Sequence, residues 1–128
     1  MNILGIDYGT KNIGLAINND TEIAFPFRSI SAGENAVEEI KDVCDEEMID
    51  EIVLGMPTKM NRSQGTLAEE IKEFAEKLKE EINLPLEFED ELLSSEMTKK
   101  MMEDYSGKYD KDAVEAAVIL QTFLDKNV

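Results

Sequence analysis

The first 31 residues constrain the fold most, because they hold three apolar runs joined by connections too short for anything but hairpins. The runs cover residues 2–7, 13–17 and 23–30. Short apolar runs bounded by Gly, Asn and Asp are typical of β-strands, so the segment predicts an antiparallel meander. Pro26 places the third strand at a sheet edge or a bulge, since proline has no N–H to offer a neighbouring strand.

Beyond residue 31, stretches with apolar residues at helical spacing alternate with two further short strands. The predicted helices are 34–47, 67–82, 94–105 and 111–124, the predicted strands are 49–55 and 84–90, and a polar loop is expected at 56–64. The order β-β-β-α-β-α-β-α-α predicts an α/β fold with a mixed five-stranded sheet, an antiparallel meander plus parallel strands, flanked by helices. At 128 residues, we expect a single domain covering residues 1–128.

The chain has no histidine and one cysteine, Cys44. The lack of histidine excludes Ser-His-Asp and Cys-His catalysis and most zinc sites. Cys44 has apolar neighbours at helical spacing, so we expect a core residue in a reducing compartment. Neither a signal peptide nor a membrane-spanning apolar stretch is recognisable, so a cytoplasmic protein without membrane association is expected. Any catalysis must use carboxylates, lysines, hydroxyls or a bound metal.

Thirteen basic and 29 acidic residues give a formal net charge of −16. This balance argues against a nucleic-acid partner, because neutralising phosphates supplies most of the affinity of such proteins. Much of the acid lies in two predicted helical stretches, 34–50 and 69–81, and is typical of solvated helix faces. Of the basic residues outside these stretches, seven lie close in sequence to the motifs described below: Lys11, Lys59, Arg62, Lys99, Lys100, Lys108 and Lys111. This distribution leaves a nucleic-acid partner open.

Acidic residues stand at three positions that a fold of this kind could bring together. Asp7 ends the first predicted strand. Asp90 and Glu91 follow the last predicted strand, which we expect to neighbour the first, and α/β sheets place functional groups at such carboxyl ends. Asp112 opens the final helix. Each position also has a purely structural interpretation: turn hydrogen bonds for Asp7, an ordinary strand end for Asp90 and Glu91, and helix capping for Asp112 or its neighbour Asp110.

Carboxylates from two neighbouring strands and one helix could form a cluster of oxygen ligands, which suits Mg²⁺ or Mn²⁺. Two such ions about 4 Å apart can activate water and stabilise the leaving oxygen during phosphodiester hydrolysis. This chemistry requires no histidine, cysteine or serine nucleophile. The inventory of residues therefore agrees with a hypothesis of two-metal hydrolysis.

Four segments, in order along nearly the whole chain, resemble the motifs of one known family. They are Leu4–Ala16, Ile52–Pro57 with the polar loop and Ala68–Glu70 that follow it, Asp90–Glu96, and Asp112–Gln121. Together they closely resemble the YqgF/RuvX family of Holliday-junction-resolvase-like proteins. The resemblance implies an RNase H-like fold and a nuclease acting on structured DNA or RNA. Its substrate would be Holliday-junction-like DNA or the end of pre-16S ribosomal RNA, in ribosome biogenesis.

The resemblance also implies roles for particular residues. It implies an acidic triad, both catalytic and metal-binding, at Asp7, Glu91 and Asp112. Two further residues would lie near the metal or the substrate phosphate, Thr10 and Lys11. Three residues of the loop 58–65 would face the nucleic acid: Lys59, Asn61 and Arg62.

One position departs from the family pattern, in which an arginine usually follows the Asp-Glu pair, and here Leu92 stands there. Arginine can bind phosphate through two hydrogen bonds and leucine cannot. The departure and the net charge keep a second hypothesis open, a catalytically weak nucleic-acid or ribosome-associated adaptor that retains the fold. A third hypothesis, an actin-like or sugar-kinase ATPase, fits the residues around Asp7 but requires two domains around the nucleotide.

The sequence leaves the oligomeric state open. Three methionines of the predicted helix 94–105, Met97, Met101 and Met102, suit either a core or the interface of a homodimer.

Overall fold

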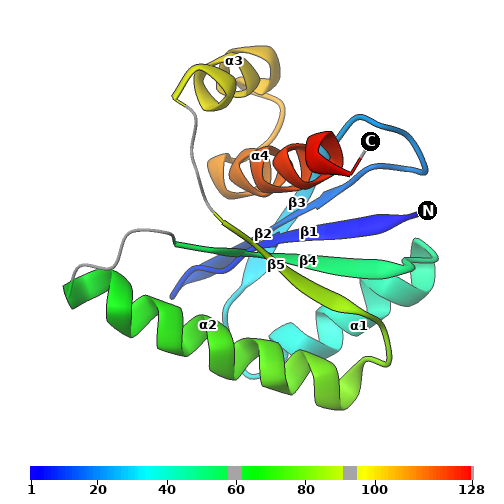
Figure 1. The fold of residues 1–128 in the computed structure, drawn as a ribbon, viewed down its shortest axis with the longest axis vertical. Coiled ribbons are helices and arrows are strands. Elements are labelled where there is room, and N and C mark those ends of the chain that lie inside the picture. The colour runs from blue at the N-terminus through cyan, green and yellow to red at the C-terminus, as the bar shows by residue number, and fades with distance from the viewer. Residues whose placement is uncertain (58–61, 91–94, 128) are drawn as a thin grey trace.

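Five strands form one mixed sheet in the computed structural model, which describes residues 1–57, 62–90 and 95–127 (Figure 1). The antiparallel meander consists of β1 (Ile3–Asp7), β2 (Asn12–Ile17) and β3 (Phe25–Ser31). Strands β4 (Glu51–Met56) and β5 (Leu86–Asp90) continue the sheet in parallel with β1. The strand order is β3-β2-β1-β4-β5. The predicted fold class is therefore confirmed.

The edge position of β3 explains how the sheet accommodates Pro26. Leu15 pairs with Arg28, whereas the next residue of β2, Ala16, pairs with Pro26. Phe27 is thus an extra residue on β3, and the pairing shifts at that point as in a β-bulge. Both alternatives predicted for this proline, an edge and a bulge, are present together.

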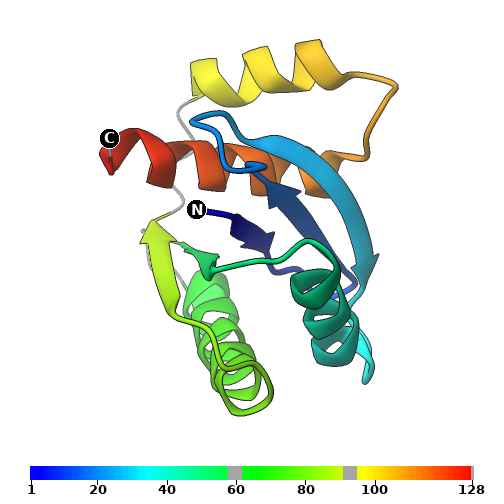
Figure 2. The ribbon, with the colours of Figure 1, turned by 90° about the vertical axis from the view of Figure 1, so that its right-hand side faces the viewer.

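Helices cover both faces of the sheet (Figure 2). Helices α1 (Ala36–Glu46) and α2 (Arg62–Glu81) pack on one face. Helix α4 (Lys111–Lys126) packs on the other face, and α3 (Ser95–Tyr105) packs on the outer side of α4 (Figure 1). Within the described ranges, no helix combines the length and the hydropathy that crossing a membrane requires.

The alternation of side chains along β1 divides the core into two layers. Leu4 and Ile6 are fully buried against α1 and α2, whereas Ile3 is buried against α4. Because alternate residues of a strand face the same side, Asp7 shares the α4 side with Ile3. Cys44 lies buried in the α1 layer, as expected, and Met101 packs against the α4 layer, so this methionine belongs to the core.

Two expectations are wrong in detail. Helix α2 begins at Arg62, inside the stretch predicted as a loop up to residue 64. Polar residues and arginine are compatible with the first turn of a helix, so polarity alone did not separate loop from helix there. In addition, β5 is not adjacent to β1, because β4 lies between them.

Candidate metal and active site

Gly14 on β2 allows the start of α4 to approach the sheet closely, next to Asp7. Gly14 is the partner of Asp7 in the pairing of β1 and β2. A Cβ atom added to Gly14 would lie 1.9 Å from the backbone oxygen of Asp112 and 2.3 Å from its carbonyl carbon. Only a residue without a side chain allows this approach. The contact therefore holds Asp112 beside the carboxyl end of β1.

A second close approach fixes α4 one helical turn further along. A Cβ atom added to Gly5 would lie 2.8 Å from the Cβ of Leu120 and 3.1 Å from the backbone oxygen of Ala116. The helix meets the sheet through small residues, and Ala113, Ala116 and Ala117 are fully buried. Two glycines on the sheet and small residues on the helix thus place α4 close along β1 and β2.

The amino end of α4 is capped by Asp110. Its Oδ1 accepts a hydrogen bond of 3.0 Å from the backbone N–H of Ala113, and its Oδ2 accepts one of 2.8 Å from the hydroxyl of Ser29 on β3. Of the two acids for which capping was considered, Asp110 is the cap. Asp112 lies in the first turn of the helix, where the helix dipole stabilises a negative charge.

Three carboxylates gather at this point. One carboxylate oxygen each from Asp7, Asp112 and Glu115 lie within 4.8 Å of one another, and all three residues are partly exposed. Asp112 and Glu115 are three residues apart, so they share one face of α4. The ammonium group of Lys111 lies 3.8 Å from a carboxylate oxygen of Glu115. Sequence reasoning brought Asp7 and Asp112 together but missed Glu115, whose three-residue spacing from Asp112 becomes a signal only when the orientation of α4 toward Asp7 is known.

The donor set fits a hard divalent cation. Because Mg²⁺ holds its oxygen ligands at 2.0–2.1 Å, two of its ligands are at most about 4.2 Å apart. The 4.8 Å limit in the cluster is close to this value, and rotation of partly exposed side chains covers the difference. Like charges at such distances repel one another, and a bound cation offsets that repulsion. The cluster can therefore hold Mg²⁺ or Mn²⁺.

Thr10 and Lys11 lie on the β1–β2 turn, three and four residues after Asp7, and both are exposed. The turn is tight, since a Cβ atom on Gly9 would lie 2.4 Å from the backbone oxygen of Asn12. The backbone oxygen of Lys11 accepts a hydrogen bond of 2.9 Å from Ala32. The turn thus holds a hydroxyl and an ammonium group at the same edge of the sheet as Asp7.

Other predicted site residues fall elsewhere. Glu91, Lys59 and Asn61 lie outside the described residues, as does Leu92. Arg62 is the first residue of α2. The expectation that the acids come from two neighbouring strands is wrong, because two strand spacings, about 10 Å, separate β5 from β1. Within the described residues, β1 and α4 supply the cluster, and the place of Glu91 in it stays a prediction.

The order of the five strands, with helices on both faces of the sheet, places the chain in the RNase H-like fold class. The fold is similar to that of T. thermophilus RuvC in complex with a Holliday junction substrate, with a TM-score of 0.67 at 12% identity over 99% of this chain and 95% of that chain. It is also similar to fowlpox virus resolvase in complex with Holliday junction DNA, with a TM-score of 0.65 at 13% identity over 100% and 99% of the two chains. Within this class, the chain belongs to the RuvX family, described as Holliday junction resolvase, which residues 1–126 match.

Relatives align with the chain over almost their whole length. The relative from Endomicrobium trichonymphae is 37% identical over 96% of this chain and 94% of its own length. The relative from Geobacillus kaustophilus is 36% identical over 98% of both chains. The relative from Natranaerobius thermophilus is 31% identical over 100% of this chain and 96% of its own. Each of the three is named "Putative pre-16S rRNA nuclease".

Proposed function

We propose that this protein is a metal-dependent endonuclease that hydrolyses phosphodiester bonds in structured nucleic acid. The observation that carries the proposal is the meeting of Asp7, Asp112 and Glu115, from a strand and a helix far apart in the sequence, in one oxygen-ligand cluster. The names of the relatives and the description of the family support a precursor of 16S rRNA or a Holliday-junction-like DNA as the substrate.

The chain's own residues have distinct tasks in this proposal. Asp7, on a rigid strand, provides a fixed ligand, and Asp112 provides a second from the helix that Gly14 docks. Glu115 adds a ligand one turn further along α4, and Glu91 would complete the triad that the family resemblance implies. Two Mg²⁺ or Mn²⁺ ions bound there would activate the attacking water and stabilise the leaving oxygen.

Substrate binding would use basic and neutral polar side chains that follow the carboxyl ends of β1 and β4. Thr10 and Lys11 are exposed on the turn after Asp7 and would contact phosphate oxygens. Lys59, Asn61 and Arg62 follow β4, whose carboxyl end lies at the same edge, and would extend the contact. The acidic helices α1 and α2 pack on the face of the sheet opposite α4. Some of the charge of α2 still reaches this edge, because burial and then the carboxylates of Glu70 and Glu73 raise the pKa of Tyr8, the residue after Asp7.

We also propose a cytoplasmic location, which the absence of disulfide-forming cysteine pairs supports, since disulfides mark oxidising compartments. A homodimer stays a prediction. Sedimentation of the full chain with and without a junction substrate would test it.

The test is a cleavage assay with end-labelled four-way DNA junctions, precursor 16S rRNA and unstructured strands, with Mg²⁺ or Mn²⁺ at low salt. We expect metal-dependent cleavage by the wild type and a loss of at least about 100-fold in Asp7→Asn and in Asp112→Asn. Asp110→Asn is the matched control, because asparagine also caps helices and the change removes one negative charge two residues from Asp112. It should keep its activity.

The same assay separates the enzyme from the adaptor. Binding of nucleic acid without cleavage of any substrate, at either metal, would contradict the proposal and favour the adaptor. A comparison of rates on the junction and on the rRNA precursor identifies the substrate class.

A further inference from the structure

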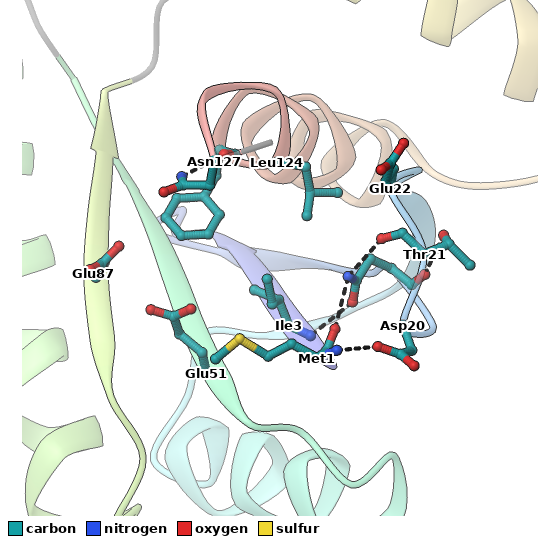
Figure 3. A pocket seen from close by; sticks show the side chains of 11 residues that line it. Met1, Ile3, Asp20, Thr21, Glu22, Glu51, Glu87, Leu124 and Asn127 are labelled. Carbon is teal, nitrogen blue, oxygen red and sulfur yellow. Dashed lines mark hydrogen bonds and ion pairs between the residues drawn. The ribbon is translucent and has the colours of Figure 1, made fainter.

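A pocket lies at the end of the sheet opposite the acidic cluster (Figure 3). Its volume is about 500 Å³. It is lined by the starts of β1, β4 and β5, by the turn after β2 and by the last turn of α4. The proposed nuclease site, at the carboxyl end of β1 and the amino end of α4, uses none of these residues.

Glu51 is the unusual residue of this pocket. Its side chain comes from the first position of β4, on the side of the sheet that faces α4, and the residue is only 9% exposed. Figure 3 shows its carboxylate directed into the pocket rather than into the sheet. Among the described residues, no hydrogen bond or ion pair satisfies it. Burial raises the pKa of Glu51, and the nearby carboxylate of Glu87 raises it further.

The same face of the sheet holds a second buried glutamate, and that one has an ion-pair partner. Glu89, on β5, is also buried, and the ammonium group of Lys126 lies 2.6 Å from its carboxylate oxygen. A buried charge normally has such a partner, because desolvation without one is costly. Glu51 is buried to a similar extent as Glu89, but no cation forms an ion pair with it among the described residues. The terminal ammonium group of Met1, which also lines the pocket, pairs with Asp20 and not with Glu51. The pocket in front of Glu51 therefore has room for a further cation.

The other groups that line the pocket define the chemistry of that cation. Glu87 projects from the strand beside Glu51, and Glu22 lies across the pocket (Figure 3). None of the lining side chains in the described ranges is basic. The last turn of α4, which ends in the pocket, adds the negative end of a helix dipole.

The remaining wall is partly polar, formed by Asn18, Asp20, Thr21 and Asn127, and partly hydrocarbon. Ile3, Leu124 and the ring of Phe123 line the pocket beside the carboxylates. Mg²⁺ and Ca²⁺ prefer a shell made of oxygen ligands and water, and they gain nothing from the hydrocarbon part of this wall. An ammonium group on an alkyl chain fits both parts, because its charge pairs with carboxylates and its methylenes bury apolar surface. A phenylalanine ring also attracts a cation placed over its face.

We propose that this pocket binds a small aliphatic ammonium ion, whose nitrogen pairs with Glu51 and Glu87 and whose alkyl chain packs on Phe123 and Leu124. The proposal does not depend on the nuclease activity. It assigns a ligand class to the end of the sheet that the proposed active site does not use.

The test is a titration of the full chain with 1,4-diaminobutane, followed by amide chemical shifts, in about 150 mM salt where long-range attraction is screened. We expect saturable binding of one molecule, with shifts gathered at the starts of β1, β4 and β5. Glu51→Gln should weaken binding about tenfold or more, since a charge-assisted hydrogen bond becomes a neutral one. The exposed Glu39 on α1 provides the matched control, and Glu39→Gln should leave the affinity unchanged.

Butane-1,4-diol keeps the alkyl chain and removes the charge, so it tests the pocket without any variant. We expect it not to bind. Three results would overturn the proposal: equal affinity in Glu51→Gln, equal affinity for the diol, or amine-induced shifts scattered over the acidic helices α1 and α2.

Discussion

Replacement of Gly14 by alanine is the most direct perturbation of the contact that positions Asp112. The new Cβ atom would lie 1.9 Å from the backbone oxygen of Asp112 and 3.0 Å from the backbone nitrogen of Ala113. Ordinary van der Waals contact begins at 3.4 Å. The first turn of α4 must therefore withdraw by about 1.5 Å, because backbone atoms cannot rotate out of the way as a flexible side chain can.

This displacement has two measurable consequences. Overpacking of this kind costs about 1–3 kcal/mol, more than the gain of about 0.5–1 kcal/mol that alanine has over glycine within a strand. For a domain of this size, the melting temperature should fall by about 5–10 °C. A shift of more than 1 Å between catalytic groups costs about 100-fold in rate, so cleavage should fall by at least that factor.

The assay compares melting temperature, Mn²⁺ affinity and cleavage rate in Gly14→Ala and Gly33→Ala. Gly33 is the matched control, because a Cβ atom there meets nothing within 4 Å. We expect Gly33→Ala to behave as the wild type in all three. If Gly14→Ala keeps the Mn²⁺ affinity and the cleavage rate of the wild type, the docking of α4 on Gly14 does not position Asp112 for catalysis.

Three further predictions concern single side chains. Glu115→Gln should weaken Mn²⁺ binding about tenfold in calorimetry, whereas the exposed Glu103→Gln should not, and equal affinities would remove Glu115 from the site. The pKa of Glu51 is raised above its ordinary 4.5, so the folded state binds this proton more tightly than the unfolded state does. The proton therefore stabilises the fold at low pH, and this stability is lost as the pH rises through the folded-state pKa. Glu51→Gln should therefore stabilise the protein in urea at about pH 8 but not at about pH 4, and an equal gain at both would contradict the linkage. Burial raises the pKa of the Cys44 thiol to about 11, so iodoacetamide at about pH 8 should label it only after unfolding, and rapid labelling of the native protein would be the contrary result.

The order of elements was predictable because it depends on local periodicity. Runs with period two and stretches with helical spacing alternate clearly in the sequence, and each became a strand or a helix within a few residues of the expected bounds. The contact between Asp7 and Asp112 was predictable in outline too. Gly14 has no side chain, and Ala113, Ala116 and Ala117 have only a methyl group, so these residues permit the close approach of helix and sheet.

The strand order was less accessible, since no local pattern encodes it. The connection from β3 through α1 to β4 passes across β2 and β1, and the connection from β4 through α2 to β5 moves one place further in the same direction. Both helices lie on one face, so right-handed crossovers run in the same direction. Strand β4 therefore takes the place beside β1, and β5 lies beyond it. Glu115 was missed for a related reason. Its role depends on the phase of α4 relative to Asp7, which is fixed by the docking at Gly14 and not by the helix alone.

Anomalous diffraction from crystals soaked in Mn²⁺ tests the central claim most directly, because it locates the ion itself. The account predicts a strong peak bonded to carboxylate oxygens of Asp7 and Asp112, with Glu115 in or next to its coordination shell, and no such peak in Asp112→Asn crystals. A peak elsewhere on this acidic surface, with none between β1 and α4, would contradict the account.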